Sequence, residues 1–506
     1  MGFVNDSTGI GLAILLGFIT FGIGNVFGTT VSTEDGAVEG IVVPLQKGNV
    51  YQFKKIPYAM PPVGPLRFSK PVKHPPWNNT LDATDFGPAC IPSGSSTHPV
   101  SEDCLFLNVY IPHEVSTTTN KSVMVWIHGG GYIYGTGMDY DGASLAIHGD
   151  VIVVTINYRL GVFGFLSTGD SAARGNYGLW DQIEALKWIK SNIKYFGGNP
   201  DSITLFGESA GAFSVSHLAI FPENKGLFHR VIMQSGSLGS YGTITKDPVK
   251  IARSLGSYLQ CSDIQNSESL VACLRRITAS DLNQASDISH MYSIFRNTLG
   301  LSLGYSPVID GEMILGDPMS IFKNQSSEHF KFYQSLDVIS GCTSAEGSLM
   351  LIYISLFPGL SLPTIDISEG IPTSVLKMFA KPFIELYHNN DTRILEPIYA
   401  KYTSEDNEEQ GRLLVNLLSD SQFYAPMLES LLVHDLNGNS KSKTFQYFFS
   451  KTSPIDGLIG VPPKWFEGAG HAAEIPYIFY NEYLDGSHKN LSTEMMSYWT
   501  NFARYG

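Results

Sequence analysis

The segment that most constrains this chain is the pentapeptide Gly207-Glu208-Ser209-Ala210-Gly211. The apolar run at residues 202–206 predicts a short buried strand, and the small residues from 210 to 221 predict a helix. A turn this tight excludes bulky neighbours, so Gly207 and Gly211 are steric requirements. The strained turn exposes the Ser209 hydroxyl. The N–H of Ala210, at the positive end of the helix, points toward any oxyanion formed beside it. Ser209 is therefore a predicted nucleophile.

Length and charge restrict the classes of protein. The chain has 506 residues, of which 43% are hydrophobic, which is enough for a large core. It has neither an internal repeat nor a flexible linker, so we expect one domain over residues 29–506. The net charge is −14 and Lys and Arg form no cluster. Nucleic acid is therefore not expected as a partner.

The N-terminus differs in character, because residues 10–27 are almost wholly apolar. Residues 1–28 are interpreted as either a cleaved signal peptide or a signal anchor that holds the chain at a membrane. Val26 and Gly28 suit a signal-peptidase site, but neither Lys nor Arg precedes the apolar run. Four glycines within the run disfavour the alternative, a buried core helix. Both favoured interpretations send the chain into the secretory pathway, as a secreted, ER-luminal or membrane-anchored protein.

The five cysteines are consistent with the secretory pathway, because disulfides persist in its oxidising compartments. Cys90 and Cys104 bracket one short loop, Cys261 and Cys273 bracket another, and Cys342 is left over. Two local disulfides would each contribute about 3 kcal/mol of stability; buried free thiols are the alternative. Sequons that permit glycosylation stand at Asn5, Asn78, Asn120, Asn324, Asn390 and Asn490.

A second glycine-rich segment follows another predicted strand. Residues 123–127 form an apolar run that ends in His128-Gly129-Gly130-Gly131. Glycines at this place let the backbone approach a ligand closely and turn its N–H groups outward. We expect Gly130 and Gly131 to donate two hydrogen bonds to an oxyanion, and Ala210 a third. Loss of one such donor raises the barrier by about 3–4 kcal/mol.

The order of the elements predicts an α/β fold. Residues 151–156 form a continuous apolar strand, and a helix with apolar residues at helical spacing opens at 178–182. The next strand ends at Ser209, which completes a βαβ unit with its reactive residue at the carboxyl end. Prolines between residues 36 and 89 exclude helix and indicate short antiparallel strands at the sheet edge. A further buried strand is expected within 332–340, and residues 351–440 are expected to be helices and loops that cap the site.

Two motifs carry a family resemblance. Residues 196–211 resemble the active-site signature of type-B carboxylesterases and cholinesterases, and residues 102–110 resemble the second signature of that family. The resemblance covers residues 30–506. It implies an α/β-hydrolase fold with a large, mostly parallel central sheet flanked by helices. It also implies structural ion pairs, Arg67 with Glu102 and Arg159 with Asp181. Relatives continue beyond Gly506 through a further segment, so we interpret the C-terminal end as truncated.

A serine nucleophile needs a base, and the base needs an acid that fixes its tautomer. His471 lies in a glycine-rich loop late in the chain, where the serine–acid–histidine order of α/β-hydrolases places the base; a structural loop histidine is the alternative. Asp310 and Glu346 both qualify as the acid by position. We favour Glu346, which directly follows an apolar strand and matches the family's glutamate. Glu208 either stabilises the imidazolium or is a solvent-exposed neighbour.

The predicted function is hydrolysis of small-molecule carboxylic esters through an acyl-enzyme, with neither cofactor nor metal. The loop between Cys90 and Cys104 has no aromatic residue that could hold a choline cation. A weaker alignment puts Leu301 and Leu303 in the acyl pocket. A general carboxylesterase for neutral apolar esters is therefore expected. The alternatives are a cholinesterase and a non-catalytic adhesion protein of the neuroligin type, which would generally lack a triad member. The sequence indicates no oligomeric state.

Overall fold

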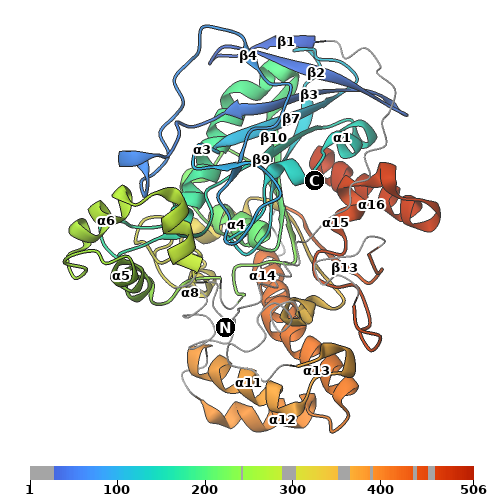
Figure 1. The fold of residues 1–506 in the computed structure, drawn as a ribbon. Helices are drawn as coiled ribbons and strands as arrows, with labels where there is room; N and C mark the ends of the chain where they lie inside the picture. Colours follow the sequence, from blue (N-terminus) through green and yellow to red (C-terminus); the bar gives the residue numbers. More distant parts are fainter. Residues whose placement is uncertain are drawn as a thin grey trace, which may run out of the picture.

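The computed structural model describes residues 28–240, 243–287, 304–351, 365–387, 391–436, 442–453 and 462–506. Within them the main sheet has eleven strands in the order β1-β2-β3-β7-β9-β8-β10-β11-β12-β13, with β4 paired to β2 (Figure 1). Its strands are β1 Gly28–Ser32, β2 Ala37–Leu45, β3 Gly48–Pro57, β4 Leu81–Asp82, β7 Phe106–Pro112, β8 Lys121–Ile127, β9 Ile152–Ile156, β10 Gly198–Glu208, β11 Arg230–Gln234, β12 Asp337–Thr343 and β13 Thr444–Phe449. A separate pair joins β5 Ala89–Cys90 to β6 Val100–Ser101.

The pairing of the strands agrees with the predicted fold class. Strands β1, β2, β3, β7 and β9 pair antiparallel in succession, and the path from β9 through β8, β10, β11 and β12 to β13 is parallel. The chain therefore has a large, mostly parallel sheet whose N-terminal strands are antiparallel, which confirms the prediction. Parallel strands place their carboxyl ends on one edge, and the elbow after β10 lies on that edge.

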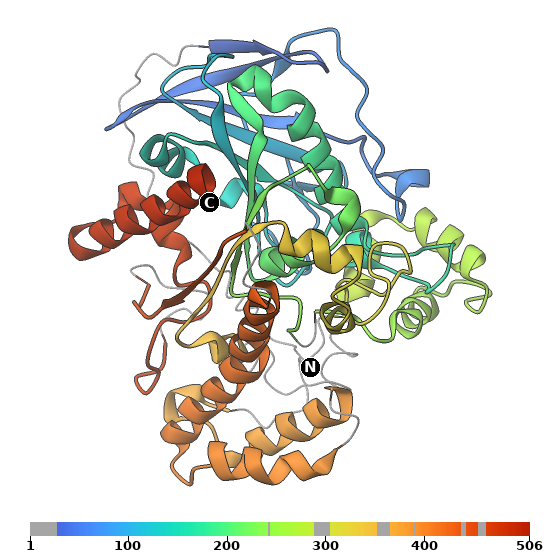
Figure 2. The same cartoon turned by 180° about the vertical axis from the view of Figure 1, so that it is seen from behind.

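Two hydrophobic cores cover the two faces of the sheet. Along β8, Val123 and Val125 belong to one core, and Met124 and Trp126 belong to the other. This alternation follows from the two-residue period of a strand. The first core includes residues of α3 and α4, and the second includes residues of α1, α15 and α16. Figures 1 and 2 show α3 and α16 on opposite sides of the sheet.

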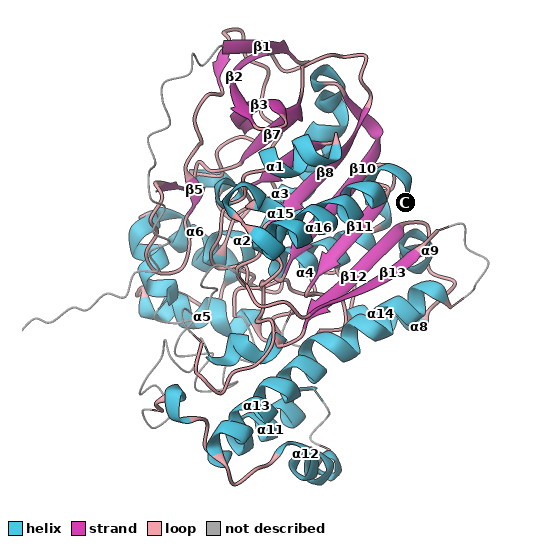
Figure 3. Ribbon diagram, turned by 90° about the vertical axis from the view of Figure 1, so that its right-hand side faces the viewer, coloured by secondary structure: helices cyan, strands magenta, loops and turns pink. Residues whose placement is uncertain are grey.

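Helices flank the sheet and form a lobe beyond its carboxyl edge. Figure 3 shows α11, α12 and α13 in this lobe, with α14 running back beside β12 and β13. A third core, which includes Leu376, Leu414 and Trp465, holds the lobe together. The α-helices are α1 Ala143–Gly149, α2 Gly161–Phe165, α3 Tyr177–Asn192, α4 Ala210–Ala219, α5 Pro248–Tyr258, α6 Ser267–Arg276, α8 Pro318–Lys323, α9 Glu328–Gln334, α11 Thr373–Tyr387, α12 Leu395–Tyr402, α13 Asn407–Ser419, α14 Ala425–Asp435, α15 Ile475–Phe479 and α16 Gly486–Tyr505.

Two local predictions are corrected by the structure, and one strand was not predicted. Residues 332–334 lie in α9, and the strand expected there begins only at Asp337, because the apolar run continues across a helix end. The proline-rich segment contains a short 3-10 helix at Gly64–Leu66, since a proline is tolerated in the first turn of a helix. Strand β13 was not expected, and it pairs with β12 as the sheet's last strand.

Both predicted disulfides are present. They join Cys90 to Cys104 and Cys261 to Cys273, and Cys342 is a buried free thiol. The predicted signal segment at residues 10–27, the acyl-pocket leucines 301 and 303, and the sequons at Asn5 and Asn390 lie outside the described residues. Across the part of the chain that the structure describes, no helix is long and apolar enough to cross a membrane.

Candidate active site

The pentapeptide forms a strained turn between β10, which ends at Glu208, and α4, which begins at Ala210. Ser209 between them has φ 54° and ψ −122°, a conformation that non-glycine residues rarely adopt. The steric role of the glycines is direct. A Cβ at position 211 would lie 2.0 Å from the backbone oxygen of Ile127, and one at position 207 would lie 2.7 Å from the same atom. The elbow can therefore pack against the end of β8 only with glycines here.

The glycine-rich loop after β8 lies directly beside Ser209. A Cβ added to Gly129 would be 3.2 Å from the Ser209 Cβ atom. Gly130 and Gly131 have φ values of 103° and 60°, which explains why glycine stands at both positions. Among the described residues, the N–H groups of Gly130, Gly131 and Ala210 donate to no other protein group. Three donors near the serine are thus free to bind an oxygen atom of a ligand.

His471 and Glu346 are brought together below the sheet edge. His471 Nδ1 lies 2.5 Å from Glu346 Oε2, and both side chains are almost completely buried. The other carboxylate oxygen, Oε1, accepts hydrogen bonds from Ser235 Oγ at 2.5 Å and from the Thr343 N–H at 2.7 Å. Glu346 is thus fixed by a hydroxyl, a backbone amide and an imidazole. This arrangement orients the histidine ring and sets its tautomer.

Backbone contacts hold the two loops in register, although 125 residues separate them. Ala345 N–H donates to the Ala469 carbonyl at 2.8 Å, and Ala345 also forms a β-bridge with Gly470. The N–H of His471 donates to Ser348 Oγ at 2.9 Å. The position of the imidazole is therefore set by the backbone as well as by its carboxylate partner.

Glu208 is buried and lies on the other side of the histidine ring. Its Oε1 is 3.0 Å from His471 Nε2, and its side chain is 5% exposed, so the alternative of a solvent-exposed neighbour is wrong. Among the described residues His471 Nε2 has no hydrogen-bond partner, so it is not hydrogen-bonded to Ser209 Oγ, whose proton it would take as the predicted base. Hydrogen bonds of this kind are often loose or misaligned until substrate binds.

A third buried glutamate, Glu474, was not predicted. Its Oε1 accepts from Gln234 Nε2 and from the Tyr447 hydroxyl, both at 3.2 Å. Trp499 of α16 donates to Gln234 Oε1 at 2.9 Å and so fixes the orientation of that amide. Glu474 follows His471 by three residues in the same loop, and this spacing was the one sequence signal that could have identified it.

The carboxylates determine the protonation of the site. Burial acts to lower the pKa of His471, but the negative charges of Glu208, Glu346 and Glu474 outweigh it and raise the pKa to about 9. Burial raises the pKa of Glu208 to about 8; His471 opposes this shift and the other two glutamates add to it. Burial and the Glu346 charge also raise the pKa of Glu474. The cluster therefore holds protons that separate side chains would release at neutral pH.

The remaining predicted residues have structural contacts. Asp310 Oδ1 accepts the N–H groups of the turn that follows it, residues 312–314, and Oδ2 accepts from Asn176. Asp310 therefore shapes a turn and makes no contact with His471. Arg159 pairs with Asp181 at 2.7 Å, in the buried arrangement that the resemblance implies.

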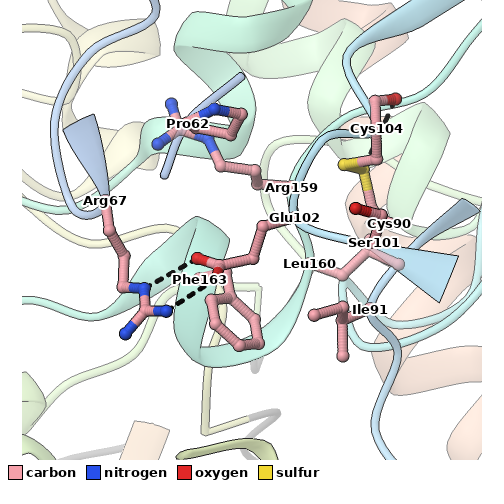
Figure 4. A pocket seen from close by; sticks show the side chains of 10 residues that line it. All are labelled: Pro62, Arg67, Cys90, Ile91, Ser101, Glu102, Cys104, Arg159, Leu160 and Phe163. Carbon is pink, nitrogen blue, oxygen red and sulfur yellow. Dashed lines mark hydrogen bonds and ion pairs between the residues drawn. A yellow bond between two sulfur atoms is a disulfide. The ribbon is translucent and has the colours of Figure 1, made fainter. Parts of the chain in front are cut away.

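Arg67 and Glu102 form the other implied ion pair, with Nε to Oε1 at 2.7 Å and Nη2 to Oε2 at 2.6 Å. Figure 4 shows this bidentate pair near the Cys90–Cys104 disulfide. Its geometry joins the proline-rich loop to the start of β7. Within the described residues, no group of three or more His, Cys, Asp or Glu side chains has an arrangement that could hold a metal ion.

Comparison with known proteins gives a family match over nearly the whole described chain. Residues 28–506 match the model of the carboxylesterase family. The bile salt-activated lipase of Bos taurus is 34% identical over 94% of this chain and 79% of its own length. The medium-chain fatty acyl-CoA hydrolase precursor of Anas platyrhynchos is 34% identical over 94% of this chain and 84% of its own. Neuroligin-3 of Mus musculus is also 34% identical over 94% of this chain, which spans 61% of that protein's length.

Proposed function

The chain belongs to the carboxylesterase family, and we propose that it hydrolyses carboxylic esters through an acyl-enzyme intermediate. One observation carries the proposal: the strained elbow holds Ser209 next to Glu208, whose Oε1 lies 3.0 Å from Nε2 of the buried His471, and the other ring nitrogen of His471 lies 2.5 Å from Glu346 Oε2. A histidine base that a carboxylate orients, close to a serine at a strand-to-helix turn, is the arrangement that activates serine as a nucleophile.

In the proposed reaction, Ser209 Oγ attacks the ester carbonyl carbon while His471 Nε2 takes the hydroxyl proton. The carbonyl oxygen becomes an oxyanion and accepts hydrogen bonds from the N–H groups of Gly130, Gly131 and Ala210. Collapse of the tetrahedral intermediate breaks the bond to the alcohol oxygen, which receives the proton from His471. Water then attacks the acyl-enzyme by the same steps, and the carboxylic acid leaves. Glu346 keeps the imidazole in place throughout.

We propose neutral apolar esters as substrates. The loop between Cys90 and Cys104 offers no aromatic face to a quaternary ammonium group, and one of its side chains, His98, pairs instead with Asp139 at 2.7 Å. The names of two relatives, a lipase and a medium-chain fatty acyl-CoA hydrolase precursor, support esters or thioesters of fatty acids as the class.

A second candidate function is adhesion without catalysis. Its support is the neuroligin relatives, which are as similar to this chain as the hydrolases are. A non-catalytic protein has no need for an activated serine. The presence of Ser209, Glu346 and His471 together therefore favours hydrolysis. If the protein does not hydrolyse esters, we expect it to bind other proteins instead.

We also propose that residues 29–506 form one domain and that residues 1–28 direct the chain into the secretory pathway. The two disulfides support this location, since such bonds persist in oxidising compartments. Residues 10–27 would either be removed or retained as a membrane anchor.

Labelling with a fluorophosphonate tests the proposal directly. The purified protein should be labelled at Ser209 and should hydrolyse p-nitrophenyl butyrate. Ser209→Ala should lose both properties while keeping its melting temperature, because the Ser209 hydroxyl has no hydrogen-bond partner among the residues that the structure describes. Ser280→Ala, an exposed serine on the surface, is the matched control and should behave like the parent. Folded parent protein that takes no label would favour the adhesion function.

Substrate class is tested separately with two substrates that carry the same butyryl group, one with a neutral and one with a cationic leaving group. The kcat/KM for a neutral naphthyl butyrate should exceed that for butyrylthiocholine. A preference for the choline ester would contradict the substrate proposal while leaving ester hydrolysis intact.

A further inference from the structure

A groove of about 360 Å³ lies between α3 and α6, and none of its lining residues belongs to the candidate active site. Its walls are residues 68–70, the loop 171–175, the first turn of α3 and Arg275 near the end of α6. Figure 1 shows where these two helices lie. Three of the lining side chains are cations, Lys70, Arg174 and Arg275, and none is acidic. This composition stands out in a chain whose net charge is −14.

Arg275 is held rigidly by neutral groups. Its Nε donates to the Arg67 carbonyl at 2.9 Å and its Nη2 donates to Ser69 Oγ at 3.1 Å. No carboxylate of the described residues pairs with it, so these bonds fix the guanidinium without neutralising its charge. The Arg275 side chain is therefore already held in place in the free protein, so binding a ligand costs less side-chain entropy.

The other two cations differ from each other. Lys70 pairs with Glu312 at the rim, and its ammonium lies 3.7 Å from the centre of the Trp180 ring. Arg174 is exposed, and its side chain has no ion pair with any described residue. The groove therefore carries two positive charges, on Arg174 and Arg275, that no protein carboxylate balances.

The N-terminus of α3 adds to the positive potential. This 16-residue helix begins at Tyr177, which lines the groove, and no acidic residue stands in its first turn. Asn176 precedes it but does not cap it, because its side chain is bonded to Val308 and Asp310. Free N–H groups at a helix start attract anions. The Asp310 carboxylate, which accepts from Asn176, lies at the same helix start and offsets part of this potential, so the main positive charge of the groove comes from Arg174 and Arg275.

We propose that this groove binds the sulfate or phosphate group of a small ligand. Guanidinium groups match such oxyanions because their fork donates two parallel hydrogen bonds. The volume lies near the lower limit for small-molecule sites, about 300 Å³, so a single anionic group with a small organic part fits. Trp180 is the partly exposed aromatic side chain of the lining and supplies apolar surface for that organic part, whereas Phe68 and Tyr177 are buried. The proposal does not depend on ester hydrolysis.

Calorimetric titration of the full chain tests the site, with sodium sulfate as one probe and phenyl phosphate as the other. Sodium chloride at equal ionic strength controls for general salt effects. We expect saturable binding of sulfate with a Kd of about 1 mM, and tighter binding of phenyl phosphate if the Trp180 surface contributes. Equal affinities would assign the site to the free inorganic anion.

Arg174→Gln should weaken binding at least about tenfold, because it removes a charge-assisted donor. Arg393→Gln is the control, because it makes the same charge change at an arginine in the helical lobe whose side chain is 88% exposed. This variant should bind sulfate like the parent. Heat signals that match those of chloride, or equal losses in the two variants, would overturn the proposal.

Discussion

Replacement of Glu208 by glutamine separates the effect of its charge from the effect of its shape. Glu208 Oε1 lies 3.0 Å from His471 Nε2, and the charges on Glu208, Glu346 and Glu474 raise the pKa of His471 to about 9. Only neutral imidazole can take the serine proton, so kcat/KM of the parent should rise with pH up to about 9. Removing the nearest negative charge lowers the pKa of His471, and the rising limb should therefore move toward lower pH.

The separation of 3.0 Å sets an upper limit on this shift. At an effective dielectric constant of about 20, two unit charges at that distance interact by about 5–6 kcal/mol. The realised value is smaller because Glu208, whose pKa is raised to about 8, itself holds a proton over part of the range. We expect a displacement of about 1–2 pH units, which corresponds to about 1.4–2.7 kcal/mol.

The assay measures kcat/KM for p-nitrophenyl butyrate between pH 5 and pH 10. Stopped assays are used, so that the protonation of the p-nitrophenol product does not affect the absorbance reading. The control is Glu114→Gln, an exposed glutamate in the surface loop that directly follows β7, which should keep the parent profile. An apparent pKa in Glu208→Gln that equals or exceeds the parent's would refute the assignment of Glu208 as the charge that sets the base.

Two other substitutions probe the frame of the site. Gly211→Ala should destabilise the fold by about 1–3 kcal/mol or more, since its Cβ would lie 2.0 Å from the Ile127 carbonyl oxygen; Gly316→Ala, with open space around the added atom, should leave the melting temperature unchanged. Ser235→Ala removes the 2.5 Å hydrogen bond to Glu346, which is worth about 1.5–3 kcal/mol with a charged partner, and should lower kcat about tenfold. Unchanged kcat would mean that the Thr343 amide alone orients the carboxylate.

Much of the sheet could be predicted because its signals are local. The continuous apolar runs at β8, β9 and β10 are typical of strands buried on both faces. Strand β13 was missed for a physical reason: Phe445 and Phe448 are exposed, and its pairing with β12 joins segments about a hundred residues apart. The expected strand at 332–340 failed because an apolar run in sequence does not reveal where a helix ends.

The local geometry of the candidate site could be predicted where a motif fixes it, and the pairing of Glu346 with His471, 125 residues apart, was expected from the family resemblance; other long-range contacts could not be predicted. Ser209 and the glycines of residues 129–131 follow from the turns that they form. The hydrogen bond between Gln234 and Trp499, by contrast, joins residues 265 positions apart, and no local sequence pattern predicts it. The burial of Glu208 also could not be derived from its neighbours, because it depends on the loop that carries His471.

The three glutamates around His471 differ in their hydrogen bonds, and this difference suggests a division of roles. Glu346 accepts three donors, so its charge is compensated where it stands and its main effect is to hold the ring. Glu208 Oε1 accepts no hydrogen bond, and its charge is thus directed at the ring nitrogen that must receive the serine proton. Burying such a carboxylate is costly, and the cost falls when the imidazole becomes a cation. We therefore propose that Glu208, when ionised, stabilises the imidazolium at the step in which the proposed reaction forms it.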